Sequence, residues 1–133
     1  MERHVATCAC GQLRLACEGA PIRVSLCHCL ACQQRTGSVF GVTARFDKEK
    51  VTIEGRSTRF VRTGDEGTRA TFRFCPDCGS TVFWQNEPQP ELIAVAVGCF
   101  ADPQFPGPII AVYEERQHPW TKHLADHPME HWR

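Results

Sequence analysis

The 133-residue chain lacks an excess of charge of either sign, because 15 lysines and arginines balance 15 aspartates and glutamates. Capture of nucleic acid or of an anionic membrane surface normally requires a basic excess. No apolar run approaches the ~20 residues that span a membrane, and the first residues lack the apolar centre of a signal peptide. We therefore expect no nucleic-acid partner, no membrane partner and a cytoplasmic location.

Internal repeats of 20–50 residues, low-complexity segments and a long amphipathic helical pattern are also missing. The length is that of one domain of ordinary size. We therefore expect a single domain over residues 1–133, with a core of about residues 4–120 and a polar tail over residues 121–133. Nothing in the sequence indicates the oligomeric state.

Short strand patterns separated by turn signals run through most of the chain. The run 92–97 is continuously apolar and short enough for a strand buried on both faces. A hairpin is expected around residues 64–67, where two glycines suit a tight turn, and a helical turn is expected to end at Gly37. The segments expected as strands are 12–17, 22–26, 39–46, 51–53, 57–63, 68–74, 80–84, 92–97 and 109–113. The predicted fold class is all-β with short helical turns.

Nine cysteines distinguish this otherwise ordinary composition. An odd number cannot all pair in internal disulfides, and clustered thiols in a reducing compartment are more often metal-binding or catalytic. Seven of them form three groups, Cys8-Ala-Cys10, Cys27-His-Cys29-Leu-Ala-Cys32 and Cys75-Pro-Asp-Cys78. Cys17 and Cys99 lie in apolar segments and are expected in the core.

The spacing of the grouped cysteines favours two metal sites. The middle group, Cys27, Cys29 and Cys32, can hold one soft metal ion and leave its fourth position open, as catalytic zinc sites do. The outer groups together supply four thiolates, enough for a closed structural site that contributes on the order of 10 kcal/mol to folding. The residues expected to form that closed site are Cys8, Cys10, Cys75 and Cys78.

Two other uses of these cysteines remain open from spacing alone. A single four-cysteine ribbon could combine Cys29 and Cys32 with Cys75 and Cys78, although it would leave Cys27 and both N-terminal thiols unused. A redox dithiol at Cys29 and Cys32 usually accompanies a βαβ pattern, which this sequence lacks. Thiolate ligands also suit iron as well as zinc.

In order along the chain, the motifs are Cys8-x-Cys10-Gly, Cys27-His-Cys29-x-x-Cys32-Gln and Phe74-Cys75-x-x-Cys78-Gly-Ser. With Thr36-Gly37-Ser38 and Pro119-Trp120, they resemble the glutathione-dependent formaldehyde-activating enzyme family, shared with centromere protein V. The resemblance implies a zinc-stabilised, Mss4-like β-tent. It also implies a structural zinc on Cys8, Cys10, Cys75 and Cys78 and a catalytic zinc on Cys27, Cys29 and Cys32.

The family's named reaction joins formaldehyde to glutathione, and its members are classed as carbon–sulfur lyases. The resemblance therefore implies a lyase with two Zn²⁺ ions that forms or breaks S-(hydroxymethyl)glutathione, with glutathione as a co-substrate. Where many relatives carry a histidine in the last strand, this chain has Ala111. The alternatives are a zinc-stabilised binding module without catalysis, and an enzyme of the same fold for another small thiol or aldehyde.

Other polar residues are weaker candidates. We expect His28, between two thiols, to point away from the metal, and the tail histidines to be solvated. Trp120 and Trp132 are expected to pin the tail to the core. The guanidinium group of arginine can form two parallel hydrogen bonds to a carboxylate, and glutathione has two carboxylates. The candidates for that contact are Arg35, Arg45, Arg59, Arg62, Arg69 and Arg73.

Overall fold

The computed structural model describes residues 2–64 and 66–133. Its strands are β1 (Arg3–Thr7), β2 (Arg14–Glu18), β3 (Arg23–Cys27), β4 (Gly41–Asp47), β5 (Val51–Glu54), β6 (Thr58–Thr63), β7 (Arg69–Phe74), β8 (Thr81–Asn86), β9 (Leu92–Ala96) and β10 (Ile110–Val112). One short helix, α1 (Leu30–Thr36), and the 3₁₀ segments η1 (Lys48–Lys50), η2 (Val97–Phe100), η3 (Glu114–Arg116) and η4 (Pro119–Asp126) connect or follow them. The prediction of an all-β fold with short helical turns is confirmed.

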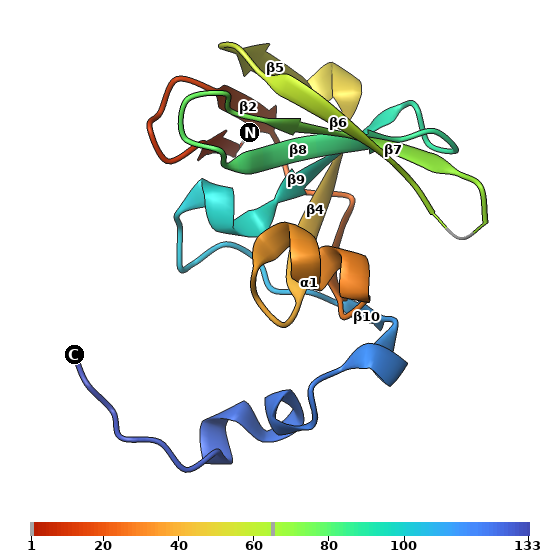
Figure 1. Cartoon of the computed structure of the whole chain (residues 1–133). Coiled ribbons are helices and arrows are strands. Elements are labelled where there is room, and N and C mark those ends of the chain that lie inside the picture. The colour runs from red at the N-terminus through yellow and green to blue at the C-terminus, as the bar shows by residue number, and fades with distance from the viewer. Residues whose placement is uncertain (1, 65) are drawn as a thin grey trace.

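The strands form two sheets (Figure 1). The smaller has the order β1-β2-β5, and the larger has the order β10-β3-β4-β9-β8-β7-β6. Neighbouring strands are antiparallel except β10, which runs parallel to β3. The sequence pattern missed β1, whose residues pair with all of β2 from Arg3 opposite Glu18 to Thr7 opposite Arg14.

The main core lies where the two sheets meet. Leu15 of β2 and Phe46 of β4 are among its fully buried side chains, together with Val82 and Val95 of the larger sheet. The central residues of β9 are all buried, which confirms the prediction of a strand covered on both faces. Burial of each such side chain contributes roughly 1.5–3 kcal/mol, so this shared core couples the two sheets.

A smaller apolar cluster forms around Phe72 of β7 and Trp84 of β8. These two residues are direct partners in the β7–β8 register, and their ring centroids lie 5.2 Å apart. The predicted hairpin is also confirmed, since β6 pairs with β7 from Thr58 opposite Phe74 to Thr63 opposite Arg69. The hairpin and the small cluster together form one wall of the region beside α1.

The helix α1 follows directly from β3. Cys29 is its N-cap, and the Cys29 Sγ accepts a hydrogen bond from the Cys32 amide at 3.3 Å. Gly37 ends the helix with φ of 73°, a left-handed conformation that glycine adopts without steric cost. The predicted turn over 33–37 is therefore the second half of a longer helix that begins at Leu30.

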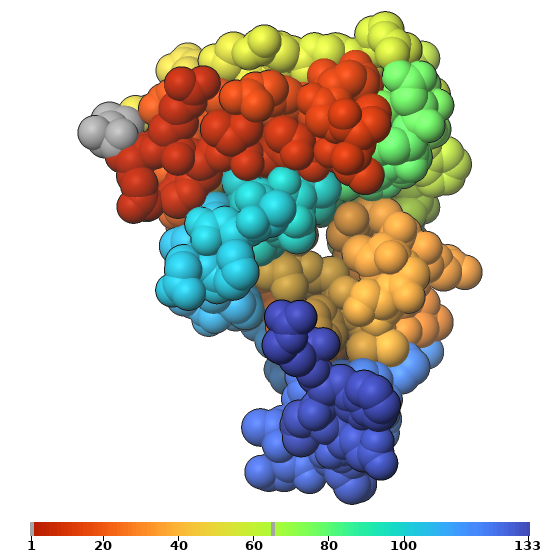
Figure 2. Space-filling view, turned by 90° about the vertical axis from the view of Figure 1, so that its left-hand side faces the viewer, coloured from red at the N-terminus to blue at the C-terminus, as the bar shows by residue number. Residues whose placement is uncertain are grey.

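The C-terminal segment runs away from the body of the molecule, as both views show (Figures 1 and 2). Trp120 is 42% exposed and Trp132 is 84% exposed, so the prediction that they pin the tail to the core is wrong. Trp120 instead packs against His118 and His127 within the tail itself. Along the described residues, no helix has the length and apolar character needed to cross a membrane.

Candidate metal centres

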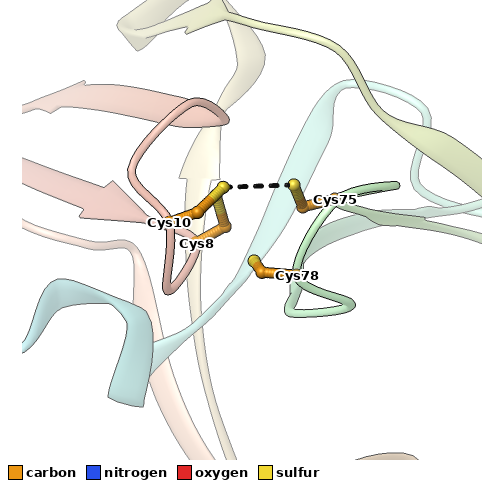
Figure 3. Close-up of side chains that lie close together, drawn as sticks. All are labelled: Cys8, Cys10, Cys75 and Cys78. Atoms are coloured by element: carbon orange, nitrogen blue, oxygen red, sulfur yellow. Dashed lines mark hydrogen bonds between the residues drawn. The ribbon is translucent and has the colours of Figure 1, made fainter.

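Four cysteines from two distant loops converge at the junction of the sheets (Figure 3). Cys8 and Cys10 lie between β1 and β2, and Cys75 and Cys78 lie between β7 and β8. Their four sulfur atoms all lie within 4.8 Å of one another. The Sγ atoms of Cys8 and Cys10 are 3.6 Å apart, and those of Cys10 and Cys75 are 3.7 Å apart.

These separations fit a tetrahedral metal ion. With Zn–S bonds of ~2.3 Å, the sulfurs of a tetrahedral site lie about 3.8 Å apart. The loops also direct donors at the sulfurs: the Leu13 amide donates to Cys8 Sγ at 3.3 Å, and the Asp77 amide donates to Cys75 Sγ at 3.4 Å. Such donors favour thiolates over thiols. The cluster therefore has the donor set and geometry of a closed four-thiolate site.

Gln12 supports the same cluster and was missed by sequence reasoning. Its Nε2 donates to Cys75 Sγ at 3.0 Å and to the Arg56 carbonyl at 2.8 Å, while its Oε1 accepts from the Arg56 amide at 2.9 Å. One amide side chain thus links the loop before β2, the segment after β5 and a cysteine of the cluster. In the sequence, the only indication that Gln12 supports the cluster is its position just after Cys8-x-Cys10-Gly.

Ser80 performs a similar role from the other loop. Its Oγ accepts a hydrogen bond from the Ala9 amide at 3.0 Å and lies 3.4 Å from Cys78 Sγ. Hydrogen bonds from the Ser80 side chain and backbone lower the pKa of the Cys78 thiol to about 5. These hydrogen bonds favour the thiolate form of Cys78, which is the form that binds a metal ion.

The second cluster consists of Cys27, Cys29 and Cys32. Cys27 ends β3, Cys29 caps α1 and Cys32 lies in its first turn, so one strand–helix junction presents all three sulfurs within 4.8 Å. A hydrogen bond from the Cys32 thiol lowers the pKa of Cys27 and raises that of Cys32. The described residues add no fourth histidine, cysteine or carboxylate to this group.

The three sulfurs suit the same soft metal ion and leave one coordination position without a protein ligand. Cys29 and Cys32 group with Cys27 and not with Cys75 and Cys78, so the single-ribbon arrangement does not form. In the part of the chain that is described, the tail histidines form no third cluster. Of the two unclustered cysteines, Cys17 is fully buried, as predicted, whereas Cys99 is half-buried at the edge of the core.

His28 does not join the second cluster, as expected from its place between two ligands. It is only 2% exposed, so it belongs to the interior and not to the surface. Its ring meets Phe40 edge-on at a centroid distance of 6.0 Å, and its Nδ1 has no hydrogen-bond partner.

Two cavities flank α1. The larger, about 600 Å³, is lined by Ala31, Gln34, Arg35, Phe60, Arg62, Phe72, Phe74, Gly79 and Thr81. The other, about 450 Å³, lies between α1 and η2, and Arg35, Gly79 and Thr81 line both. In Figure 2, the orange α1 segment and the cyan η2 segment stand on either side of that second cavity.

Of the six candidate arginines, the structure places Arg35 and Arg62 in the larger cavity. The guanidinium carbon of Arg35 lies 4.3 Å from the ring centroid of Trp84, and that of Arg62 lies 4.9 Å from that of Phe72. Arg69 pairs with Glu87 at 3.0 Å, and Arg45 donates to Ser25 Oγ at 3.1 Å. Arg59 and Arg73 are direct partners across the β6–β7 hairpin.

A search of curated proteins found no match. Among solved structures, a crystal structure of a Rhodobacter sphaeroides protein from a structural genomics programme is similar, with a TM-score of 0.60 and 21% identity. The similarity covers 81% of this chain and 99% of that chain and shows a shared fold.

The model of the family described as glutathione-dependent formaldehyde-activating enzyme matches residues 3–116. The match takes in every strand and both cysteine clusters and ends before η4. The Mss4-like β-tent architecture implied by the family resemblance is thereby confirmed. The chain belongs to the glutathione-dependent formaldehyde-activating enzyme family.

Proposed function

We propose that the protein is a zinc-dependent carbon–sulfur lyase that forms or breaks a thiol–aldehyde adduct such as S-(hydroxymethyl)glutathione. The observation that carries this proposal is the cluster of Cys27, Cys29 and Cys32, which has no fourth protein ligand among the described residues. Membership of an enzyme family named for formaldehyde and glutathione supports it. A fourth protein ligand would have favoured a purely structural metal and a binding module.

We assign different roles to the two clusters. Cys8, Cys10, Cys75 and Cys78 would hold a structural zinc, because four thiolates complete a tetrahedral shell. Cys27, Cys29 and Cys32 would hold the catalytic zinc, since they lie at a strand–helix junction whose helix, α1, lines two cavities with room for a small molecule.

The residues of the three-cysteine cluster set the chemistry that the site supports. When bound there, a zinc ion lowers the pKa of a thiol ligand, so that a thiolate exists at neutral pH. The three cysteine thiolates give the centre a formal charge of −1, which suits thiolate addition to an aldehyde better than activation of water. In that addition the C–S bond forms, the carbonyl π bond breaks and the carbonyl oxygen gains a proton; the lyase direction reverses each change.

The test compares metal content with turnover. Freshly purified wild-type protein should contain two zinc ions per chain by elemental analysis and should accelerate exchange between formaldehyde, glutathione and their adduct, followed by NMR magnetisation exchange. Cys29→Ala should keep one zinc and the fold but lose the acceleration. Cys17→Ala, a change at a cysteine outside both clusters, should keep two zinc ions and turnover.

Retained turnover in Cys29→Ala with one zinc lost would overturn the catalytic assignment. A wild-type chain that takes up only one zinc on reconstitution would also overturn it, and would favour the binding module.

A further inference from the structure

We propose that the larger cavity beside α1 binds the carboxylate of an apolar acid that carries no ammonium group next to it. As a substrate class, this favours the carboxylate of a mercapto acid, or the glycyl carboxylate of glutathione, over a carboxylate that lies beside an ammonium group. The link to turnover rests on the lyase function proposed above, whereas the binding itself does not.

Two cations face this cavity. Arg35 comes from α1 and Arg62 from β6, and their guanidinium carbons lie 6.0 and 4.9 Å from the ring centroid of Phe72. Both side chains are partly buried. Two like charges are thus held over one aromatic ring.

Neither cation has a carboxylate partner among the described residues. The ion pairs found there join Arg3 to Glu18, His4 to Glu2, Arg56 to Asp77 and Arg69 to Glu87. The Nε and Nη2 atoms of Arg35 are buried without a hydrogen-bond partner. Arg35 interacts with the thiolate of Cys32, which can balance only one of the two cations. A carboxylate entering between Arg35 and Arg62 would balance the other.

The rest of the lining defines the remainder of the ligand. The walls are mainly apolar because three phenylalanines line them, Phe60, Phe72 and Phe74. The guanidinium group of Arg35 also stacks on the ring of Trp84. Stacked guanidinium groups keep their edges free to form two parallel hydrogen bonds to a carboxylate. A cavity of about 600 Å³ lies within the range of small-molecule sites.

The cavity has no group that would accept an ammonium. Its lining contains no aspartate or glutamate, and its neutral polar side chains are Gln34 and Thr81. The γ-glutamyl end of glutathione carries an ammonium beside its carboxylate. That ammonium would face Arg35 and Arg62, and like charges at close range repel one another.

The position of the cavity connects it to the three-cysteine cluster. Ala31, Gln34 and Arg35 project from one face of α1, the same helix that carries Cys32. Cys32 and Arg35 are three residues apart and therefore neighbours on the helix surface. A carboxylate on Arg35 would place the rest of the substrate beside the first turn of α1.

The experiment uses three probes that differ by one group each: 3-phenylpropionate, its neutral amide 3-phenylpropanamide, and L-phenylalanine, which adds an ammonium. Binding to the zinc-loaded protein is measured by calorimetry and by NMR shifts of the Ala31 and Thr81 amides. We expect 3-phenylpropionate to bind at least tenfold more tightly than either of the other two.

Substitutions test whether Arg62 binds the carboxylate of the probe. Arg62→Gln should weaken binding of 3-phenylpropionate at least tenfold, and Arg62→Lys should weaken it less. Arg69→Gln, at an arginine already paired with Glu87 and outside the cavity lining, should change it less than twofold.

Equal affinity for the acid and the amide, equal affinity for the acid and L-phenylalanine, no effect of Arg62→Gln, or no binding at millimolar concentration would each overturn the inference. If the probe binds as expected while the protein shows no lyase activity, the proposed function fails and the acid site stands. If the lyase is active while the probe test fails, the acid site fails alone.

Discussion

A Cβ atom added to Gly41 would lie 2.9 Å from the Nη2 atom of Arg35. Gly41 begins β4 directly opposite Cys27, and the same added atom would lie 3.6 Å from the Cβ of Cys32. Glycine at this position thus leaves space for Arg35 and does not serve an unusual φ. It allows the guanidinium group of Arg35 to lie between β4 and Trp84.

We predict that Gly41→Ala displaces Arg35 without unfolding the protein. Because Nη2 is the end of a flexible side chain, the clash is relieved by a side-chain shift, and stability should change by no more than about 1 kcal/mol. Binding of 3-phenylpropionate should weaken several-fold by calorimetry. Gly107→Ala, where an added Cβ meets nothing within 4 Å, is the matched control. Unchanged probe affinity in Gly41→Ala would show that the guanidinium position is unimportant.

Removing a ligand from the four-cysteine cluster should affect stability far more than removing one from the three-cysteine cluster. A structural zinc contributes on the order of 10 kcal/mol, comparable with the ~5–15 kcal/mol stability of a whole domain. We expect Cys75→Ser to be largely unfolded at 25 °C by circular dichroism, and Cys29→Ala to unfold within a few degrees of wild type. Similar melting temperatures for the two variants would contradict the division into structural and catalytic sites.

The acidity of Cys78 gives a pH prediction for the four-cysteine cluster. Hydrogen bonds from Ser80 lower the pKa of Cys78 to about 5, against an ordinary value of 9.0. Because protons compete with a metal ion for the thiolate, a lowered pKa lets the cluster keep its zinc to lower pH. Ser80→Ala should therefore raise the pH at which zinc is released, followed with a colorimetric zinc chelator during acid titration. An unshifted release midpoint would mean that Ser80 does not set the pKa.

Gln33 should hold the C-terminal segment to the body. Its Nε2 donates to the His28 carbonyl at 2.9 Å and to the Arg116 carbonyl at 3.1 Å, and its Oε1 accepts from His118 Nε2 at 2.9 Å. Loss of these bonds in Gln33→Ala should cost about 1–3 kcal/mol locally and speed proteolysis after Arg116. Gln34→Ala, at the exposed neighbouring position, should leave the cleavage rate unchanged. Equal cleavage rates for both variants would assign the attachment to other contacts.

The sequence could predict the features that depend on residues close together in the chain. Alternation and apolar runs identified most strands, and the spacing of Cys27, Cys29 and Cys32 against the outer pairs identified both clusters. The thiol groups were recognisable because seven cysteines in three short motifs are rare without a shared ligand. β1 was missed because its five residues, Arg-His-Val-Ala-Thr, carry little apolar alternation, and pairing with β2 makes it a strand.

The features that sequence could not predict depend on contacts between distant residues. Gln12, Gln33 and Arg35 are ordinary polar residues whose roles come from partners as far as 85 positions away in the chain. For the C-terminal segment, the sequence suggested a long-range contact where the structure has local ones. Trp120 was expected to pack against the core, but its ring packs against His118 and His127 in the same segment.

The two clusters differ in when they can exist during synthesis of the chain. The three-cysteine cluster spans only six residues, 27–32, so all of its cysteines are synthesised almost together. Cys10 and Cys75 are 65 residues apart, an interval of about 3–13 s at ~5–20 residues per second. As the chain is made, the three-cysteine cluster is therefore complete first, while the N-terminal pair still lacks Cys75 and Cys78. The site that joins the two sheets is the last of the two to be completed.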